Sequence, residues 1–232
     1  MRRVLGVFAK QPIAGHSKTR LAQTTSAAWA ERVAVAFLHD SLDRFASVDA
    51  ECVLVYWPES AGGFFAKAGQ DRYRLQVQSA GDLGQRLRHF FSSAHHDANT
   101  HAIAVGSDSP TLPIAYIETA FQLLATHDVV LGPAQDGGYY LVGMKQMHEP
   151  LFVDIPWSSA SVLEKTVQQV TGESVSLAIL PVWYDVDTEQ DWAMMRGHIR
   201  AMRRAGIDPG APRVERLMAE SEVGARGLVD SV

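Results

Sequence analysis

The sequence has little of three things: cysteine, long apolar runs and excess positive charge. Cys52 is its one cysteine, so no disulfide can form within the chain, and a reducing cytoplasm is the expected location. No apolar run approaches the roughly 20 residues that cross a bilayer, so we expect no membrane span. A formal net charge of -5 argues against nucleic-acid binding, which needs a basic face. What remains is typical of a globular protein.

Acidic residues are also absent from the first thirty positions, since the first one is Glu31. An acid-poor start bearing Arg2 and Arg3 is compatible with a targeting segment. Against this, the apolar run 4–8 is too short for a signal peptide and fits a first core strand. We therefore interpret the N-terminal segment as part of the mature fold.

Strand-like and helix-like segments alternate along the chain. Strands are predicted at 4–8, 52–56, 74–77, 102–105, 128–131, 139–142 and 176–180. Helices are predicted from 26 onward and at 83–98, 114–125, 161–170 and 189–205. This alternation predicts a three-layer α/β/α domain over 1–205 with a mostly parallel, mixed sheet. The stretch 206–232 is expected to be an extension, a linker followed by a short polar helix.

Two predicted strands end in carboxylates. Asp108 follows the strand at 102–105, and Asp187 follows a second acidic strand end. In open α/β sheets ligands bind beyond the carboxyl ends of strands, where such side chains can hold a divalent cation. For Asp108 the alternative is a cap on the next helix. Of the pair Asp185 and Asp187, alternation turns one toward the site, and we choose Asp187 because it comes last before the helix.

A basic loop follows the first strand. Backbone N–H groups and cations in such a position can hold a polyphosphate; the alternative is a solvated basic loop. It is not a P-loop, because Ser17 rather than glycine precedes Lys18. The candidate phosphate-binding residues are Ala9, Lys10, Gly15, Lys18 and Arg20.

Two glycine-containing segments are further candidates. Asp82 and Gly84 open a predicted helix and suit contacts to a base or ribose, or form only a turn and a cap. In the second segment, two glycines let backbone approach a ligand beside two tyrosines, or else form a tight turn with tyrosines in the core. Its residues are Asp136, Gly137, Gly138, Tyr139 and Tyr140.

Taken in order, these motifs resemble a known family. They run Phe-Ala-Lys-x-Pro-x-x-Gly-x-x-Lys-Thr-Arg-Leu, Gly-Asp-Leu-Gly, Gly-Ser-Asp-Ser-Pro, Asp-Gly-Gly-Tyr-Tyr-Leu, Ile-Pro-Trp-Ser and Asp-Val-Asp-Thr, over about residues 3 to 195. The pattern is similar to a bacterial group of glycosyltransferase-A-type (GT-A) proteins related to phospholactate guanylyltransferase. The resemblance implies a nucleotide-diphospho-sugar transferase fold, with a nucleotide-binding half at about 1–110 and an acceptor-binding half at about 111–205.

The resemblance also implies roles for single residues. Lys18 and Arg20 match the basic pair of the guanylyltransferase-like loop, and Ser107 joins the nucleotide-binding set. Asp108 and Asp187 match metal-binding acids, which would hold Mg²⁺ or Mn²⁺. We expect their carboxylates to converge within roughly 4–6 Å, and we expect the loop that carries Lys18 to be exposed.

Two reactions are compatible with this set. In nucleotidyl transfer to a small phosphorylated acceptor, Lys18 and Arg20 would neutralise the leaving pyrophosphate of a nucleoside triphosphate, with Asp108 holding the metal. In glycosyl transfer from a nucleotide sugar, the segment 136–140 and Trp157 would form the acceptor and sugar pocket. We favour nucleotidyl transfer; a third alternative is a non-catalytic protein that binds nucleotide sugars.

Overall fold

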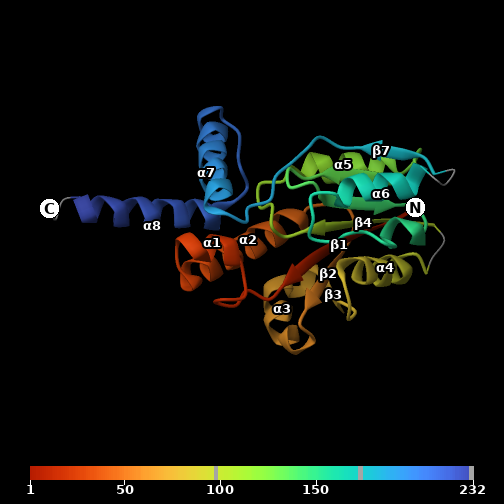
Figure 1. The fold of residues 1–232 in the computed structure, drawn as a ribbon, viewed down its shortest axis with the longest axis horizontal. Helices are drawn as coiled ribbons and strands as arrows, with labels where there is room; N and C mark the ends of the chain where they lie inside the picture. The colour runs from red at the N-terminus through yellow and green to blue at the C-terminus, as the bar shows by residue number, and fades with distance from the viewer. Residues whose placement is uncertain (97–98, 172–174, 230–232) are drawn as a thin grey trace. The chain divides into compact units, whose positions relative to one another are not determined.

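The computed structural model describes residues 1–96, 99–171 and 175–229, and the chain forms two compact units (Figure 1). Unit 1 comprises Met1–Gln11, Phe45–Ser107 and Leu112–Asp185. Unit 2 comprises Pro12–Arg44, Asp108–Thr111 and Val186–Val232. The division of the sequence into a nucleotide-binding half and an acceptor-binding half is one of function, and it stays a prediction.

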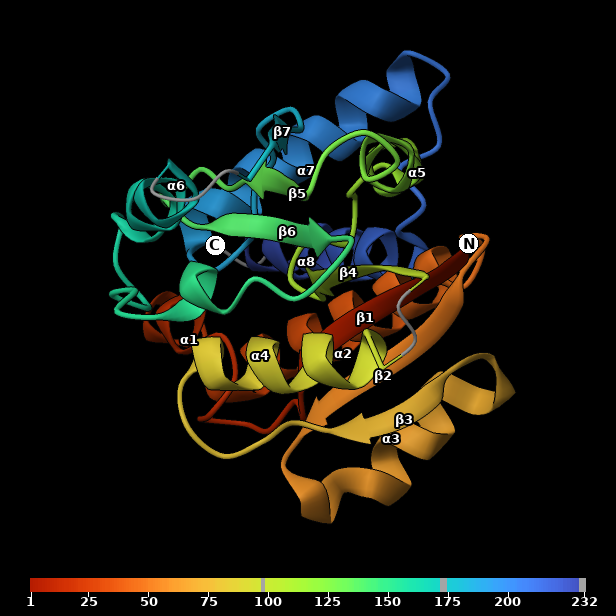
Figure 2. The same ribbon diagram turned by 90° about the vertical axis from the view of Figure 1, so that its right-hand side faces the viewer.

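Unit 1 contains a seven-stranded sheet with the order β3-β2-β1-β4-β6-β5-β7 (Figure 2). All neighbouring pairs are parallel except those of β6, which runs antiparallel to β4 and β5. This confirms the mostly parallel, mixed sheet. The strands are β1 (Arg2–Lys10), β2 (Glu51–Trp57), β3 (Arg74–Val77), β4 (Thr100–Gly106), β5 (Val129–Pro133), β6 (Tyr139–Met144) and β7 (Leu177–Ile179).

Helices cover both faces of this sheet. On one face α4 packs so tightly that a Cβ on Gly6 of β1 would lie 2.4 Å from the ring of Phe90. On the other face α5 places Phe121 under the guanidinium of Arg3, 5.1 Å from the ring centre. Figure 2 shows α4 in front of the sheet. The helices of unit 1 are α3 (Gly62–Gly69), α4 (Leu83–Ala94), α5 (Ile114–Leu123) and α6 (Val162–Thr171), with 3-10 turns η1 (Glu59–Ala61), η2 (Gln70–Arg72) and η3 (Glu149–Phe152).

Two of these helices differ from the prediction. α4 ends at Ala94, whereas the apolar pattern predicted a helix to 98; residues 97 and 98 lie outside the described part of the chain. α3 was not predicted, because it begins with two glycines, the poorest helix formers after proline. Its stability comes from packing, since Phe65 is fully buried in the core of unit 1.

Unit 2 is built from helices. Trp192 of α7 lies at its centre, edge-on to Trp29 of α2 at 5.9 Å and stacked on Phe37 of α2 at 6.3 Å. The helices are α1 (Thr19–Thr24), α2 (Ala27–Phe45, whose last residue belongs to unit 1), α7 (Glu189–Arg204) and α8 (Pro212–Val229). None of the helices in the described ranges is long and apolar enough to span a membrane.

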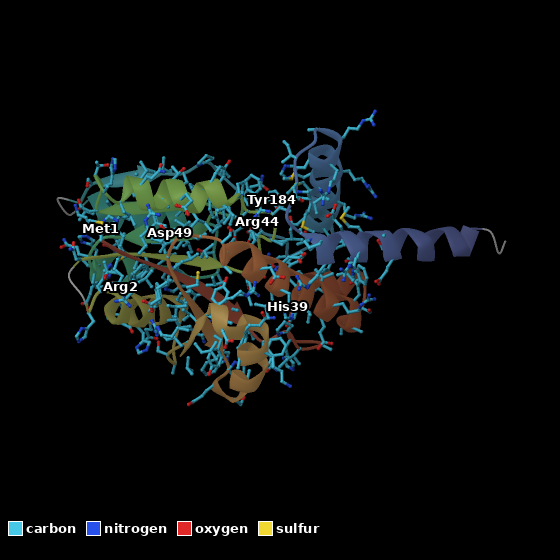
Figure 3. All side chains as sticks on the ribbon, turned by 180° about the vertical axis from the view of Figure 1, so that it is seen from behind. Met1, Arg2, His39, Arg44, Asp49 and Tyr184 are labelled. Carbon is cyan, nitrogen blue, oxygen red and sulfur yellow. The ribbon has the colours of Figure 1, made fainter. Side chains whose placement is uncertain are left out.

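The C-terminal extension forms a longer helix than the sequence suggested, because α8 has 18 residues and its beginning is held by α2. The carboxylate of Asp40, fully buried, accepts hydrogen bonds from the backbone N–H groups of Arg213 and Val214 at 3.0 Å. It also accepts one from the Arg213 guanidinium at 3.0 Å. Arg44, labelled in Figure 3 near the end of α2, donates to the carbonyl of Pro209 at 2.6 Å.

Candidate active site

Three of the predicted site residues meet in unit 2. The Lys18 ammonium lies 2.6 Å from a carboxylate oxygen of Asp108 and 2.8 Å from one of Asp187. Lys18 and Asp187 are 169 positions apart in the sequence. The Phe37 ring lies under the ammonium, 5.4 Å from the nitrogen to the ring centre. One buried cation therefore brings together two carboxylates from distant parts of the chain.

The backbone around Lys18 is shaped by a tight turn. The amides of His16 and Ser17 donate to the Ile13 carbonyl at 3.0 Å, and Gly15 adopts a φ of 78°. Lys18 itself has a φ of 47° and stands at the N-cap of α1. A left-handed conformation costs a non-glycine residue about 1 kcal/mol or more. Its ion pairs offset that cost, and Lys18 ends the loop with its side chain turned inward.

Asp187 is positioned by the start of α7. Thr188 is the N-cap, and it forms a capping box with Asp191. The Asp191 carboxylate accepts hydrogen bonds from the backbone N–H groups of Asp187 at 3.1 Å and Thr188 at 2.8 Å. Because the helix start is satisfied by Asp191, the Asp187 carboxylate is left to pair with Lys18.

The charges of this cluster depend on one another. Burial alone would lower the pKa of Lys18, but the carboxylates of Asp108 and Asp187 outweigh it, and the pKa is raised above its ordinary value. The Lys18 side chain is 5% exposed, whereas those of Asp108 and Asp187 are 58% and 44% exposed. The loop is exposed as predicted, at residues 13–16, but the side chain of Lys18 is buried because two carboxylates draw the ammonium inward.

The donor set fits a divalent cation in part. Two half-exposed carboxylates are hard oxygen ligands, and Mg²⁺ in proteins is often held by one or two carboxylates together with substrate phosphates. In the described ranges, no group of three or more His, Cys, Asp and Glu side chains gathers as a metal cluster. A metal at Asp108 and Asp187 would therefore need ligands from water or nucleotide, and it would meet the charge of Lys18.

The other predicted phosphate-binding residues differ in their exposure and contacts. Arg20, in the first turn of α1, is exposed and has no ion-pair partner among the described residues. Ala9 is buried and its carbonyl accepts a hydrogen bond from Gln78 at 3.2 Å, whereas Lys10 at the end of β1 is exposed. Ser107, the residue after β4, is half-buried.

Unit 1 has a small pocket of its own at the carboxyl ends of β1 and β4. Its volume is about 120 Å³, and Gly106 forms part of its wall. β6 is antiparallel, so its first residues, Tyr139 and Tyr140, reach the same edge. The lining is almost wholly apolar and comprises Phe8, Leu83, Leu87, Ala104, Val105, Gly106, Tyr139, Tyr140 and Val142. This position in the sheet is where ligands bind in open α/β folds.

The segment at 81–85 has a structural role. Gly81 adopts a φ of 102°, and Asp82 caps α4 by accepting from the Gln85 amide at 2.8 Å. A Cβ on Gly84 would lie 2.7 Å from the Phe152 carbonyl oxygen and 2.8 Å from Nε1 of Trp157. The turn and the cap are therefore present; contacts of Asp82 and Gly84 with a nucleotide stay a prediction.

The segment at 136–140 likewise forms a tight turn. The exposed Asp136 accepts from the Gly138 amide at 2.9 Å, and a Cβ on Gly137 would lie 2.1 Å from the Ala160 carbonyl oxygen. Tyr140 is buried and donates to the Pro181 carbonyl at 3.0 Å. Tyr139 packs edge-on to Trp157, with 6.3 Å between ring centres. Both tyrosines thus serve the core and the pocket wall.

One polar pair in unit 1 escaped the sequence reasoning. Gln78 is buried and donates to the carbonyls of Ala9 at 3.2 Å and Val55 at 2.8 Å. Its own oxygen accepts from Arg86, whose guanidinium lies over the Trp57 ring at 5.2 Å. Arg86 stands within the Gly-Asp-Leu-Gly-Gln-Arg segment, which was its only signal.

Comparison with solved structures identifies proteins with a similar fold. The chain is similar to a protein from Desulfovibrio desulfuricans G20, provisionally named a nucleotide-diphospho-sugar transferase, with a TM-score of 0.87, 28% identity and 98% of each chain covered. It is also similar to a cytidylyltransferase from Leptospira borgpetersenii (TM-score 0.60, 14% identity, 96% of each chain). A third similar structure is CMP:2-keto-3-deoxy-manno-octonic acid synthetase in complex with CTP (TM-score 0.50, 11% identity, 87% of this chain and 99% of the other). The fold is GT-A-like.

Comparison by sequence gave one family. A model described as "Uncharacterized protein conserved in bacteria (DUF2064)" matches residues 41–159, more than half of the chain. No protein with a curated description matches. The matched range includes Asp108 and both glycine-containing segments, whereas Lys18 and Asp187 lie outside it.

Proposed function

Because this chain belongs to the DUF2064 family and has a GT-A-like fold, we propose that it is a metal-dependent transferase that uses a nucleotide. Its favoured reaction is nucleotidyl transfer from a nucleoside triphosphate to a small phosphorylated acceptor. The observation that carries the proposal is the pairing of Asp108 and Asp187 on one ammonium, with both carboxylates half-exposed. Two hard oxygen ligands open to solvent suit a divalent cation that also binds phosphates.

In this proposal Asp108 and Asp187 hold Mg²⁺ or Mn²⁺, which supplies positive charge to the phosphate oxygens when bound. Arg20 is an exposed cation two positions after Lys18, and it is the first candidate to bind the outer phosphates. Such cations act by neutralising charge that develops on the leaving group. In unit 1, the apolar pocket beside Tyr139 suits a flat or apolar part of a ligand.

Glycosyl transfer from a nucleotide sugar is the second candidate, favoured by the name of the Desulfovibrio protein. The two reactions release different products. Nucleotidyl transfer releases pyrophosphate, whereas glycosyl transfer releases a nucleoside diphosphate or monophosphate. A protein that only binds nucleotide sugars would release neither.

A thermal-shift panel tests these proposals. It compares ATP, CTP, GTP, UTP and nucleotide sugars, each with and without Mg²⁺ or Mn²⁺; GTP is included because of the resemblance to phospholactate guanylyltransferase. We expect triphosphates with metal to raise the melting temperature most. The shift is measurable, because a ligand present at 100 times its Kd stabilises the folded protein by about 2.7 kcal/mol. Asp108→Asn and Asp187→Asn should abolish the metal-dependent part. Asp71→Asn, a change on the exposed turn η2, should not.

The pattern of thermal shifts distinguishes the two transfer reactions and tests the metal site. Larger shifts with nucleotide sugars than with triphosphates would favour the glycosyltransferase. Metal-dependent shifts that survive both asparagine variants would refute the site proposed for the metal. Pyrophosphate release on addition of candidate phosphorylated acceptors would then identify nucleotidyl transfer directly.

A further inference from the structure

We propose that Lys18 is the resident counter-ion of the Asp108–Asp187 pair, and that it leaves the pair when a metal-bound nucleotide arrives. The inference rests on the proposed function and deepens it. It assigns to one lysine two successive sets of anionic partners: first the two carboxylates, then the phosphates. The consequence is that the free protein takes up divalent cations poorly unless the nucleotide is present.

The contacts of Lys18 support the first half of this proposal. Its ammonium bonds to both carboxylates, at 2.6 and 2.8 Å, and its side chain is 5% exposed. The Phe37 ring occupies a further side of the nitrogen. The ammonium therefore already occupies the place where a cation shared by Asp108 and Asp187 would bind.

Electrostatic repulsion by Lys18 should weaken the binding of a divalent cation to the free protein. A divalent cation on the same carboxylates would lie within a few ångströms of the ammonium, and like charges at that distance repel by an amount worth at least about tenfold in affinity even in water. The phosphates of a nucleotide remove this conflict, because they provide new oxygen partners for the ammonium. Lysine suits such an exchange, since its charge sits on a flexible stem of four carbons.

The backbone at Lys18 supports the second half. Lys18 lies at the junction between the exposed residues 13–16 and α1, and its φ of 47° is one that side chains rarely adopt. Strained backbone at a ligand site is commonly held in place by contacts that a ligand can replace. Here the contacts are the two ion pairs, so the loop and the pair are released together.

Binding of Mn²⁺ alone, measured by electron paramagnetic resonance without nucleotide, tests the counter-ion role. Lys18→Met should bind Mn²⁺ at least about tenfold more tightly than the wild type. Lys18→Arg keeps the charge and should stay weak. Lys67→Met removes the same charge from the exposed side of α3 and serves as the matched control. Equal Mn²⁺ affinity in Lys18→Met and the wild type would overturn the proposal.

Ammonium NMR tests the exchange in the wild type, so the result does not depend on how well a variant folds. The chain has only five lysines, and the signal of Lys18 is identified by its loss in Lys18→Arg. We expect that signal to shift on addition of Mg²⁺ with CTP or with GTP. An unchanged signal at saturating metal and nucleotide would refute the exchange. Absence of any metal-dependent nucleotide binding would instead refute the proposed function, leaving the Mn²⁺ comparison valid.

Discussion

Replacement of Asp40 by alanine should strongly destabilise the attachment of α8. Asp40 has a fully buried side chain that accepts from the N–H groups of Arg213 and Val214 and from the Arg213 guanidinium. Alanine leaves two helix-start N–H groups without their acceptor. It also removes the buried partner of the Arg213 guanidinium, which then keeps the exposed Asp43, 2.6 Å away.

The magnitude follows from these three bonds. Loss of a helix cap costs roughly 0.5–2 kcal/mol, and an unsatisfied buried donor costs about 1–3 kcal/mol. Part of this loss is offset, because Asp40→Ala also removes the cost of burying a carboxylate. That cost is visible in the pKa of Asp40, which burial raises and which the bonds from Val214 and Arg213 only partly lower again. We expect a loss of about 2–3 kcal/mol for Asp40→Ala. Asp40→Asn keeps an acceptor without the charge and should cost about 1 kcal/mol or less.

Urea unfolding of both variants measures these differences, and hydrogen exchange at the Val214 amide reports on α8 itself. Asp43→Ala is the control: it removes an exposed partner of the same guanidinium and should cost less than about 1 kcal/mol. The reasoning is refuted if Asp40→Ala and Asp43→Ala have equal effects, or if Asp40→Asn is as damaging as Asp40→Ala.

The dependence on pH has a defined sign. Since the pKa of Asp40 is higher in the fold than its ordinary 3.8, the folded protein binds this proton more readily than the unfolded chain. The wild type should therefore gain stability relative to Asp40→Asn as the pH falls through the raised pKa toward 3.8, and this advantage is lost as the pH rises. Repeating the urea curves across this range measures it; a gap that widens in the opposite direction would contradict the burial argument.

Two further changes test the packing of unit 1. Gly84→Ala should cost about 1–3 kcal/mol of stability in urea unfolding, because its Cβ would meet the Phe152 carbonyl oxygen at 2.7 Å. Gly63→Ala is the control and should be neutral or stabilising, because a Cβ there has nothing within 4 Å. Equal effects of the two substitutions would argue against the close approach at Gly84. Burial raises the pKa of Cys52 to about 11, so in the folded protein iodoacetamide should label it roughly a hundredfold more slowly than an ordinary thiol at pH 8, and rapid labelling would show that the thiol is accessible.

The sequence was most informative where the signal is local. The strand at 74–77 has the predicted bounds, and Asp108 does follow a strand and precede a helix. Asp187 precedes α7 as predicted, but the prediction that a strand ends there is wrong, because β7 already ends at Ile179 and, of the described residues between β7 and α7, only Trp183 forms an isolated bridge. Gly81 and Asp82 form the turn and cap that their types favour. In these cases each residue's own conformational preference decides the outcome.

It was least informative where the partner lies far along the chain. Lys18 sits among exposed polar residues, so nothing local predicts its burial against Asp187, 169 positions later. Asp40 lies within a helix and resembles a solvated side chain, yet it is buried by residues 173 and 174 positions ahead. Such pairings depend on the tertiary fold, which periodicity and residue type describe only in outline.

The composition of unit 2 from three separate segments has a consequence for synthesis. Its first segment, Pro12–Arg44, leaves the ribosome early, but its final segment begins only at Val186. Until then Lys18 lacks Asp187, and Asp40 lacks Arg213 and Val214. The apolar faces of Trp29 and Phe37 also lack Trp192. Contacts between such distant positions form late and slowly. A nascent chain stalled before residue 186 therefore exposes an incomplete helical unit, which makes this the stage most open to chaperone binding or aggregation.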